Sequence, residues 1–211
     1  MRTGVLGGTF DPVHNGHIAI AAAVRHRLQL DTVRFVPCRR PPHKDRPDLT
    51  LSADRLAMVA LGTQDDETLV PCSAELARPA PSFTIDTLRE MSRHEPAVQF
   101  VFIMGMDSFR ELDTWKEYEA LIRDYHLAVV GRPSHRPSPQ TGDVPADIRE
   151  RLVDGATGIA GDAGRIHFIE AAPVDVSATG VREQARRGDS LDGLVPAPVA
   201  AYIRKCALYR S

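Results

Sequence analysis

Residues 4–30 read GVLGGTFDPVHNGHIAIAAAVRHRLQL, and this stretch decides the expected fold. Its short apolar start, 4–6, is typical of a buried strand, and its end, 18–30, is typical of an amphipathic helix. Glycines and a proline lie in the turn between them. A strand that passes through a glycine-rich turn into a helix is the first half of a βαβ unit.

The rest of the chain repeats this alternation of short apolar runs and amphipathic segments. Further strands are expected at 33–36, 69–71, 100–104, 127–130 and 166–169, and further helices at 52–61, 85–94 and 115–124. Because strands that alternate with helices pair in parallel, we expect an α/β fold with a Rossmann-like, doubly wound parallel sheet. Two segments break the alternation and are expected to be loops, 37–50 and 132–145.

The C-terminal part of the chain is expected to be helical. Ser177 is a candidate N-cap for a helix that stops at Gly188, and Pro196 begins a second helix that runs to about Leu208. This gives a helical segment over about 177–211. At 211 residues the chain is long enough for one domain with a substantial core, so we expect a single domain over 1–211.

The composition limits the range of partners and compartments. The 26 Lys and Arg and 28 Asp and Glu leave a formal net charge of -2, which gives no global basic field for nucleic acid. No run approaches the roughly 20 apolar residues of a membrane span. The three cysteines, Cys38, Cys72 and Cys206, are outside metal-type spacings and favour a reducing compartment. We expect a soluble cytoplasmic protein without protein metal ligands, and homo-oligomerisation is left open.

The turn after the first strand carries residues that suit a phosphate. Gly7 and Gly8 let the backbone approach a phosphate closely, and the helix start offers N–H donors. His14 and His17 are three residues apart, so on a helix they share one face and can contact one polyphosphate. Such groups suit attack on phosphorus, where catalysis is mostly positioning and electrostatic stabilisation. From this spacing alone, two solvent-exposed histidines in an ordinary turn are an equal alternative.

The whole string 7–17, GGTFDPVHNGH, resembles the signature of the HxGH nucleotidyltransferases, which transfer a nucleotide from a nucleoside triphosphate and release pyrophosphate. The resemblance implies that His14 and His17 contact the phosphates of ATP. It also implies contacts to ATP from the residues between the strand and these histidines, which are Gly7, Gly8, Thr9 and Phe10.

A second motif, 176–182 (VSATGVR), resembles the phosphate-binding helix start of the same family. The resemblance implies that Arg182 binds the β- and γ-phosphates and that Ser177 and Thr179 contribute hydroxyl contacts to ATP. Ala178 departs from the family pattern, which often has serine there, so one hydroxyl contact is missing. Taken alone, this motif also fits a capped surface helix.

Three further segments resemble the bacterial nicotinate-nucleotide adenylyltransferases: 41–44 (PPHK), 81–88 (PSFTIDTL) and 105–121, which begins GMDSF. With 194–196 and 202–203, the resemblance covers nearly the whole chain, and 132–165 is covered least. It implies that ATP and nicotinate mononucleotide are the substrates and that the products are nicotinate adenine dinucleotide and pyrophosphate, in NAD biosynthesis. Mg²⁺ is expected on the ATP phosphates, held mainly by substrate oxygens and water.

The same resemblance assigns roles to residues of these segments. Trp115 would stack on the pyridine ring, and the backbone amides of Thr84 and Tyr118 would bind the nicotinate carboxylate. The residues implied to contact ATP are Gly105, Asp107, His43, Lys44 and Arg132. Without the resemblance, Trp115 would equally fit the core of an amphipathic helix, Asp107 a helix N-cap, and the basic 37–50 loop a solvated surface.

Two other functions are left open by the sequence. One is an enzyme of the same chemistry that prefers the amide, nicotinamide mononucleotide. The other is a catalytically silent module that senses ATP or a dinucleotide. The intact set of His14, His17 and Arg182 argues against the silent module, because a sensor does not need these groups.

Overall fold

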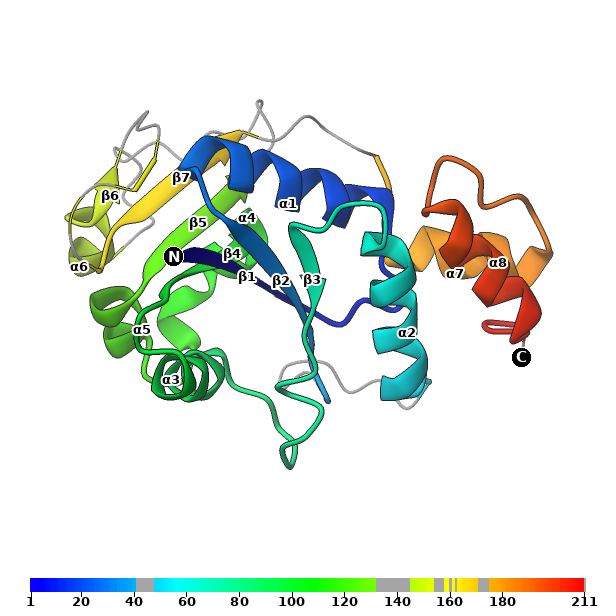
Figure 1. Cartoon of the computed structure of the whole chain (residues 1–211), viewed down its shortest axis with the longest axis horizontal. Coiled ribbons are helices and arrows are strands. Elements are labelled where there is room, and N and C mark those ends of the chain that lie inside the picture. The colour runs from blue at the N-terminus through cyan, green and yellow to red at the C-terminus, as the bar shows by residue number, and fades with distance from the viewer. Residues whose placement is uncertain are drawn as a thin grey trace. The chain divides into compact units, whose positions relative to one another are not determined.

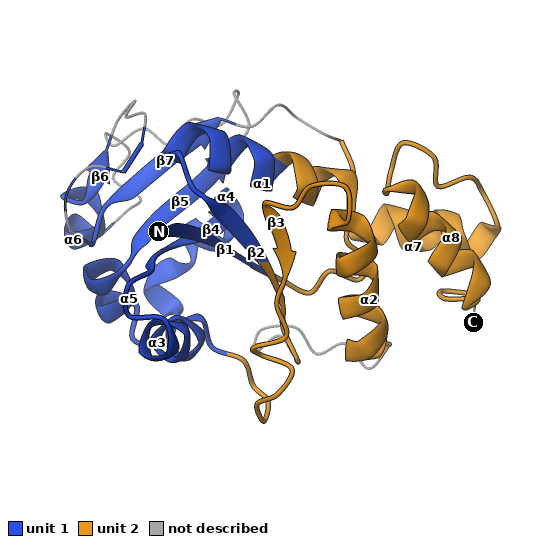
Figure 2. Ribbon diagram, in the orientation of Figure 1, with its two compact units in different colours: residues 1–7, 20–34, 83–172 blue, residues 8–19, 35–82, 173–211 orange. Residues whose placement is uncertain are grey.

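The computed structural model describes residues 1–40, 48–131, 145–153, 158–159, 161, 163–170 and 175–210. The chain divides into two compact units, which Figure 2 colours separately. Unit 1 comprises residues 1–7, 20–34 and 83–172, and unit 2 comprises residues 8–19, 35–82 and 173–211. The single domain expected from the length stays a prediction.

The strands form a seven-stranded sheet in the order β3-β2-β1-β4-β5-β7-β6 (Figure 1). Their bounds are β1 Arg2–Gly8, β2 Thr32–Pro37, β3 Leu69–Pro71, β4 Gln99–Gly105, β5 His126–Gly131, β6 Leu152–Val153 and β7 Ile166–Glu170. The pairs β1 with β4, β4 with β5, and β7 with both β5 and β6 are parallel. This confirms the Rossmann-like α/β fold. Each expected strand is present, and β6 is an addition.

The strand order reverses between β1 and β4, which lie side by side in unit 1. From β1 the sheet continues through β2 and β3 on one side, and through β4, β5 and β7 on the other. Leu6 lies opposite Ile103 in this register, so β1 and β4 end at the same edge of the sheet. Ligands of doubly wound sheets bind at the carboxyl ends of the strands beside such a reversal.

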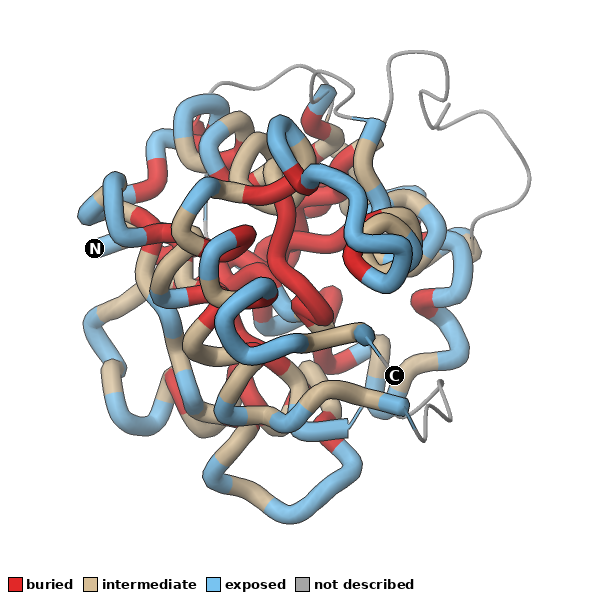
Figure 3. Tube along the Cα trace, turned by 90° about the vertical axis from the view of Figure 1, so that its right-hand side faces the viewer, coloured by how far each residue is buried: buried red, intermediate tan, exposed pale blue. Residues whose placement is uncertain are grey.

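Apolar side chains of the strands form the core of unit 1. Val5, Val101, Leu127 and Val129 are almost fully buried, and Figure 3 traces buried positions in red. Three helices alternate with the strands: α3 (Thr84–His94) precedes β4, α4 (Met106–Arg110) follows β4, and α5 (Tyr118–Asp124) precedes β5. Helices α3 and α4 contact β4, and α3 also contacts α5. The short α6 spans Ala146–Arg149.

Unit 2 holds the first part of α1 (Asn15–Leu28), α2 (Ser52–Thr63), α7 (Ala178–Arg187) and α8 (Ala197–Lys205). Helix α2 packs against α8. The packing is close at Gly62, where an added Cβ would lie 3.1 Å from Val13 and 3.3 Å from Val199. Among the residues that the structure describes, no helix combines the length and hydropathy needed to cross a membrane.

Several expected helices have different bounds in the structure; the first, expected over 18–30, spans Asn15–Leu28. The last helix ends at Lys205 and not at about Leu208, because the chain turns over 206–209 and Ala207 takes a positive φ of 50°. The helix expected over 115–124 begins only at Tyr118. A short 3₁₀ helix, η1 (Leu112–Thr114), precedes Trp115, and Glu117 has left-handed backbone angles (φ 50°, ψ 45°) that end helical continuity.

Candidate active site

The signature loop lies in unit 2 and connects the end of β1 to α1. Glycine at position 8 leaves room for the Phe10 ring, because a Cβ there would lie 3.0 Å from that ring. The carbonyl of Gly8 accepts a 2.9 Å hydrogen bond from the Cys38 amide. At the far end of the loop, Asn15 donates from its backbone amide to the Leu194 carbonyl at 2.9 Å and from Nδ2 to the Gly193 carbonyl at 2.8 Å. The loop is therefore anchored at both ends.

His14 and His17 form a stacked pair at the start of α1. Their ring centroids are 3.7 Å apart with an interplanar angle of 27°. The Phe10 and His17 rings pack edge to face, with their centroids 5.0 Å apart. Nδ1 of His17 accepts a 3.2 Å hydrogen bond from the His14 amide, so in the neutral ring the proton is on Nε2. The structure thus brings the two expected histidines together and gives His17 a defined donor atom.

Burial keeps both histidines neutral at physiological pH. Desolvation lowers the pKa of His14 to about 4. The pKa of His17 is lowered to about 3, first by desolvation and then by the neighbouring His14. Because His14 is only 8% exposed, the alternative of two solvent-exposed histidines is wrong for this residue. In a site from which water is partly excluded, the hydrogen bonds from two neutral donors to a negatively charged group are stronger than they are in bulk water.

Arg182 is held against the signature loop from α7. One of its terminal nitrogens, Nη1, donates to the Asp11 carbonyl at 2.8 Å, and Nη2 donates to the Thr179 hydroxyl at 3.1 Å. Ser177 is the N-cap, as expected, because its hydroxyl accepts a 3.1 Å hydrogen bond from the Gly180 amide. The guanidinium has five N–H donors, so these two bonds fix its orientation without using all of them.

Arg55 is a structural residue of this site that the sequence reading missed. It is 0% exposed on α2, and its Nη1 donates to the Thr9 carbonyl at 2.7 Å. Its Nη2 donates to the Arg39 carbonyl at 3.2 Å, and its Nε donates to the Thr50 carbonyl at 3.0 Å. A buried guanidinium thus holds the signature loop and both described ends of the 37–50 loop. In sequence it resembles any charged residue of an amphipathic helix, and no local signal marks it.

Tyr209 is a second missed residue. Its hydroxyl donates to Oδ1 of Asp11 at 2.8 Å. Burial, followed by the Asp11 carboxylate, raises the pKa of the Tyr209 phenol well above its usual value. Asp11 is itself 1% exposed, so the bond ties the C-terminal segment to a buried position of the signature loop. The two residues are nearly the full chain apart, and no sequence pattern connects them.

The candidate residues for the mononucleotide lie in unit 1. Trp115 is half-buried on the segment between η1 and α5. Its ring meets the Phe102 ring of β4 edge to face, with centroids 6.0 Å apart. Phe102 in turn lies 3.3 Å from the Cβ position of Gly7, which leaves room for that ring at the end of β1. The alternative of Trp115 inside an amphipathic helix is wrong, because no helix passes through it.

Thr84 and Tyr118 each open a helix of unit 1. Thr84 is the first residue of α3, and Tyr118 is the first residue of α5. The amides in the first turn of a helix have no intrahelical acceptor, so they point outward as donors. Burial, and next the Asp147 carboxylate, raises the pKa of the Tyr118 phenol. The backbone of these positions, rather than their side chains, is therefore the part suited to a carboxylate.

Gly105 is the last residue of β4, beside the strand-order reversal, and Asp107 follows it in α4. A Cβ on Gly105 would meet nothing within 4 Å, so its backbone is open to approach. The Asp107 side chain is fully exposed and lies 3.5 Å from Arg110. The N-cap of α4 is Gly105, so the alternative of Asp107 as an N-cap is wrong. Residues His43, Lys44 and Arg132 lie outside the described residues, and their roles stay predictions.

Comparison with known proteins gives the class. The Cytidylyltransferase-like family model matches residues 5–184. A protein of Pseudomonas fluorescens named "Probable nicotinate-nucleotide adenylyltransferase" is 41% identical over 100% of this chain and 98% of its own length. One of the same name from Geobacter metallireducens is 37% identical over 99% of this chain and 98% of its own. The chain therefore belongs to the cytidylyltransferase-like nucleotidyltransferases.

Within that class the chain belongs to the nicotinate-nucleotide adenylyltransferase family, and the expected resemblance is confirmed. The solved structure of the Plasmodium falciparum nicotinic acid mononucleotide adenylyltransferase, complexed with NaAD, has the same fold. It superposes with a TM-score of 0.75 at 17% identity and covers 99% of this chain and 97% of its own. A second structure of that enzyme, complexed with APC, gives a TM-score of 0.74 at 16% identity over 99% and 96% of the two chains.

Proposed function

We propose that this chain transfers the adenylyl group of ATP to nicotinate mononucleotide, in the biosynthesis of NAD. The products are nicotinate adenine dinucleotide and pyrophosphate. Family membership over the full chain supports the activity. The observation in the structure that carries it is the stacked pair of His14 and His17 on the signature loop, to which Arg182 is also bonded through the Asp11 carbonyl.

The reaction is a direct in-line displacement at the α-phosphorus of ATP. An oxygen of the mononucleotide 5′-phosphate forms the new bond to phosphorus. The bond from the α-phosphorus to the bridging oxygen breaks, and its electron pair leaves with pyrophosphate. The attacking phosphate is already ionised, so no general base is required. The work of the protein is to position the two phosphates and stabilise the developing negative charge.

His14, His17 and Arg182 supply that stabilisation. The Nε2–H of His17 is the donor to the α-phosphate, because Nδ1 is occupied by the His14 amide. His14 completes the contact with the polyphosphate from the stacked position. Arg182, oriented by Asp11 and Thr179, carries the charge that develops on the leaving pyrophosphate.

The remaining ATP contacts are supplied by backbone and hydroxyl groups. Gly7, Gly8, Thr9 and Phe10 contribute the backbone of the signature loop. The start of α7 contributes Thr179 and, through its role as N-cap, Ser177. Gly105 and Asp107 contact the adenosine part. His43, Lys44 and Arg132 are proposed to reach the triphosphate and adenine.

Nicotinate mononucleotide is proposed to bind in unit 1. The half-buried Trp115 offers a ring face to the pyridine, an offset arrangement that contributes about 0.5–1.5 kcal/mol beyond burial. The Thr84 and Tyr118 amides donate to the carboxylate. An acid gains these charge-assisted bonds, whereas an amide cannot offer the same negative charge, so the acid is the preferred substrate.

Magnesium is proposed to enter with ATP. Within the described parts of the chain, no group of three or more His, Cys, Asp or Glu side chains gathers to hold a metal ion. In this proposal the ion keeps several waters and is held mainly by the phosphate oxygens of ATP. We also propose a cytoplasmic location and no nucleic-acid partner, and the formation of a homo-oligomer is open to measurement.

The test is to incubate the protein with Mg–ATP and nicotinate mononucleotide and to quantify both products. Nicotinate adenine dinucleotide and pyrophosphate should form in equal amounts. ATP binding with no pyrophosphate released would favour the catalytically silent sensor, and product formation only with nicotinamide mononucleotide would favour the amide-specific enzyme.

A further inference from the structure

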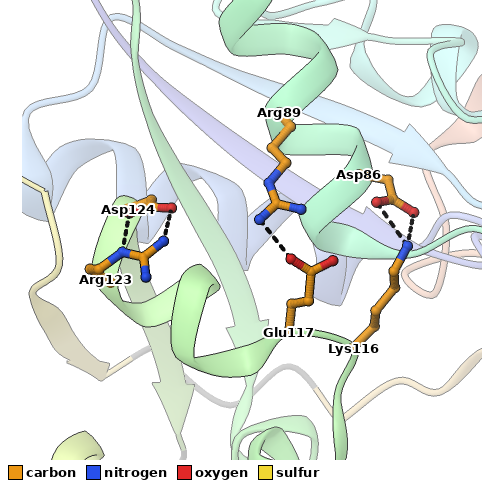
Figure 4. Close-up of polar contacts among 6 residues, drawn as sticks. All are labelled: Asp86, Arg89, Lys116, Glu117, Arg123 and Asp124. Atoms are coloured by element: carbon orange, nitrogen blue, oxygen red, sulfur yellow. Dashed lines mark hydrogen bonds and ion pairs between the residues drawn. The ribbon is translucent and has the colours of Figure 1, made fainter.

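Two ion pairs tie the segment that carries Trp115 to helix α3 (Figure 4). Nζ of Lys116 lies 3.0 and 2.9 Å from the two carboxylate oxygens of Asp86. Nη2 of Arg89 donates to Oε2 of Glu117 at 2.7 Å. The two partners on α3 are the acceptor Asp86 and the donor Arg89. They are three residues apart and therefore share one face of the helix. The residues that follow Trp115 are therefore fastened to α3 at two successive points.

The backbone of this segment departs from regular helix geometry. Trp115 has an extended backbone at the end of η1, and Glu117 adopts the left-handed region, which is unfavourable for a residue with a Cβ. The side chains of Lys116 and Glu117 are exposed. The Trp115 ring meets the Phe102 ring edge to face, and Nζ of Lys116 lies 5.0 Å from the centre of the Phe83 ring.

We propose that Arg89 and Lys116 are positioning residues for the mononucleotide, and this inference rests on the proposed function. Their ion pairs fix Trp115 relative to Thr84 at the first turn of α3. A pyridine ring and its carboxylate are rigidly joined, so the stacking face and the amide donors must keep one separation to bind both at once. Mobility of the Trp115 segment would weaken the binding of the mononucleotide and leave that of ATP unchanged.

The two pairs act by position and not by attracting the anionic substrate. Each cation faces a carboxylate at hydrogen-bond distance, so each pair carries no net charge. A single exposed ion pair contributes little to stability, but two on consecutive residues restrain the same short segment. Lys116 is the better member to change in its pair, because Asp86 also lies in the first turn of α3, where a carboxylate favours the helix.

The chain offers a matched control on α5. Arg123 and Asp124 form a third ion pair, with Nε to Oδ1 at 2.7 Å, in the same part of unit 1 (Figure 4). These residues are neighbours in sequence and lie on one element, so their hydrogen-bonded pair does not bridge the Trp115 segment to α3. Arg123→Gln removes an ion pair of similar exposure without releasing the Trp115 segment.

The experiment compares Arg89→Gln, Lys116→Gln, the double variant and Arg123→Gln in the full chain. Each single change at the ties should raise KM for nicotinate mononucleotide by a factor of about 2–5, as expected for losing one exposed ion pair. The double variant should show a larger rise. KM for ATP and kcat should stay within about twofold of the wild type, and Arg123→Gln should change nothing.

A second readout needs no substrate. Trp115 is the only tryptophan of the chain, so its fluorescence reports on this segment alone. Quenching by acrylamide should increase in the double variant and not in Arg123→Gln. Exchanging the charges of one pair in the same protein, Arg89→Glu with Glu117→Arg, keeps the ion pair. This variant should therefore show quenching and a KM closer to the wild type than Arg89→Gln does.

Unchanged KM and unchanged quenching in the double variant would overturn the proposal. So would an equal rise of KM for both substrates with a lower melting temperature, because that result indicates general destabilisation. A wild-type protein that forms no product from nicotinate mononucleotide would instead overturn the proposed function, and the positioning role would be lost with it.

Discussion

At the scale of single residues, the proposed site depends on two histidines that burial keeps neutral in the free protein. The Nε2–H of His17 is assigned to the α-phosphate by the bond that its Nδ1 accepts. We expect His17→Ala to lower kcat by a factor on the order of 10²–10³, as for removal of one donor to a charged transition state. Steady-state kinetics at saturating substrates test this. A near-normal kcat would remove His17 from the catalytic set.

The low pKa values of these residues predict that ATP binding is coupled to proton uptake. In the free protein, His14 and His17 titrate at about 4 and about 3. A bound polyphosphate favours the charged form of His14 and raises its pKa, whereas Nδ1 of His17 already accepts the His14 amide and has no place for a proton. Net proton uptake should therefore accompany ATP binding between about pH 4 and neutrality, and calorimetry in buffers of different ionisation enthalpy measures it. Heats that do not depend on the buffer would contradict this coupling.

Some residues of the site could be predicted from sequence and others could not. His14, His17, Ser177 and Arg182 lie in short motifs, and the structure brings His14 to His17 and Arg182 to the loop between Phe10 and His14. Arg55 could not be found, because its role depends on three carbonyls that the fold brings to it. Local patterns carry no information on such long-range bonds.

At the scale of elements, the segment between η1 and α5 decides where Trp115 lies. Apolar periodicity over 115–124 predicted a helix through Trp115, but the helix begins at Tyr118. The break is at Glu117, whose left-handed backbone is not marked by a glycine or proline. Strand β6 could not be predicted either, because it has only two residues and no period can be read from so short a strand.

The position of Trp115 outside a helix predicts a selective effect on one substrate. Trp115→Ala should raise KM for nicotinate mononucleotide and leave KM for ATP nearly unchanged, because the ring face is lost while the phosphate-binding residues stay in place. Kinetics with each substrate varied in turn measure the two values. Equal losses for both substrates would indicate that the indole supports the core instead.

At the scale of the whole molecule, the alternation of strands and helices was sufficient to predict the fold. Six strands and the doubly wound order follow from apolar runs and the glycine turn at 7–8. The division into two compact units was not predicted, because each unit is assembled from three separate stretches of the chain. Sequence patterns describe neighbours along the chain and not the grouping of distant stretches.

Buried histidines also predict how the stability of the protein depends on pH. Burial lowers the pKa of His14, of His17 and, followed by the charge of Arg165, of His167. As the pH falls below about 6.5, the unfolded chain binds protons that the folded chain does not. The contribution of these histidines to the free energy of unfolding should therefore be complete above about pH 6.5. It should be lost progressively as the pH falls toward about 4.

His167→Leu provides the matched variant for this pH dependence. Both ring nitrogens of His167 are buried and have no hydrogen-bond partner among the described residues, so an apolar side chain is tolerated there. Urea unfolding should give a smaller loss of stability between about pH 7 and pH 5 than in the wild type. The same loss in both proteins would show that His167 does not contribute.

The most direct test of the account is the ratio of kcat/KM for nicotinate mononucleotide to that for nicotinamide mononucleotide, with Mg–ATP and pyrophosphate release as the signal. The two substrates differ only in the group that we propose to face the Thr84 and Tyr118 amides. We predict that the acid is preferred by about 10²-fold or more, because only a carboxylate forms charge-assisted bonds with these donors. Equal values, or preference for the amide, would contradict the account.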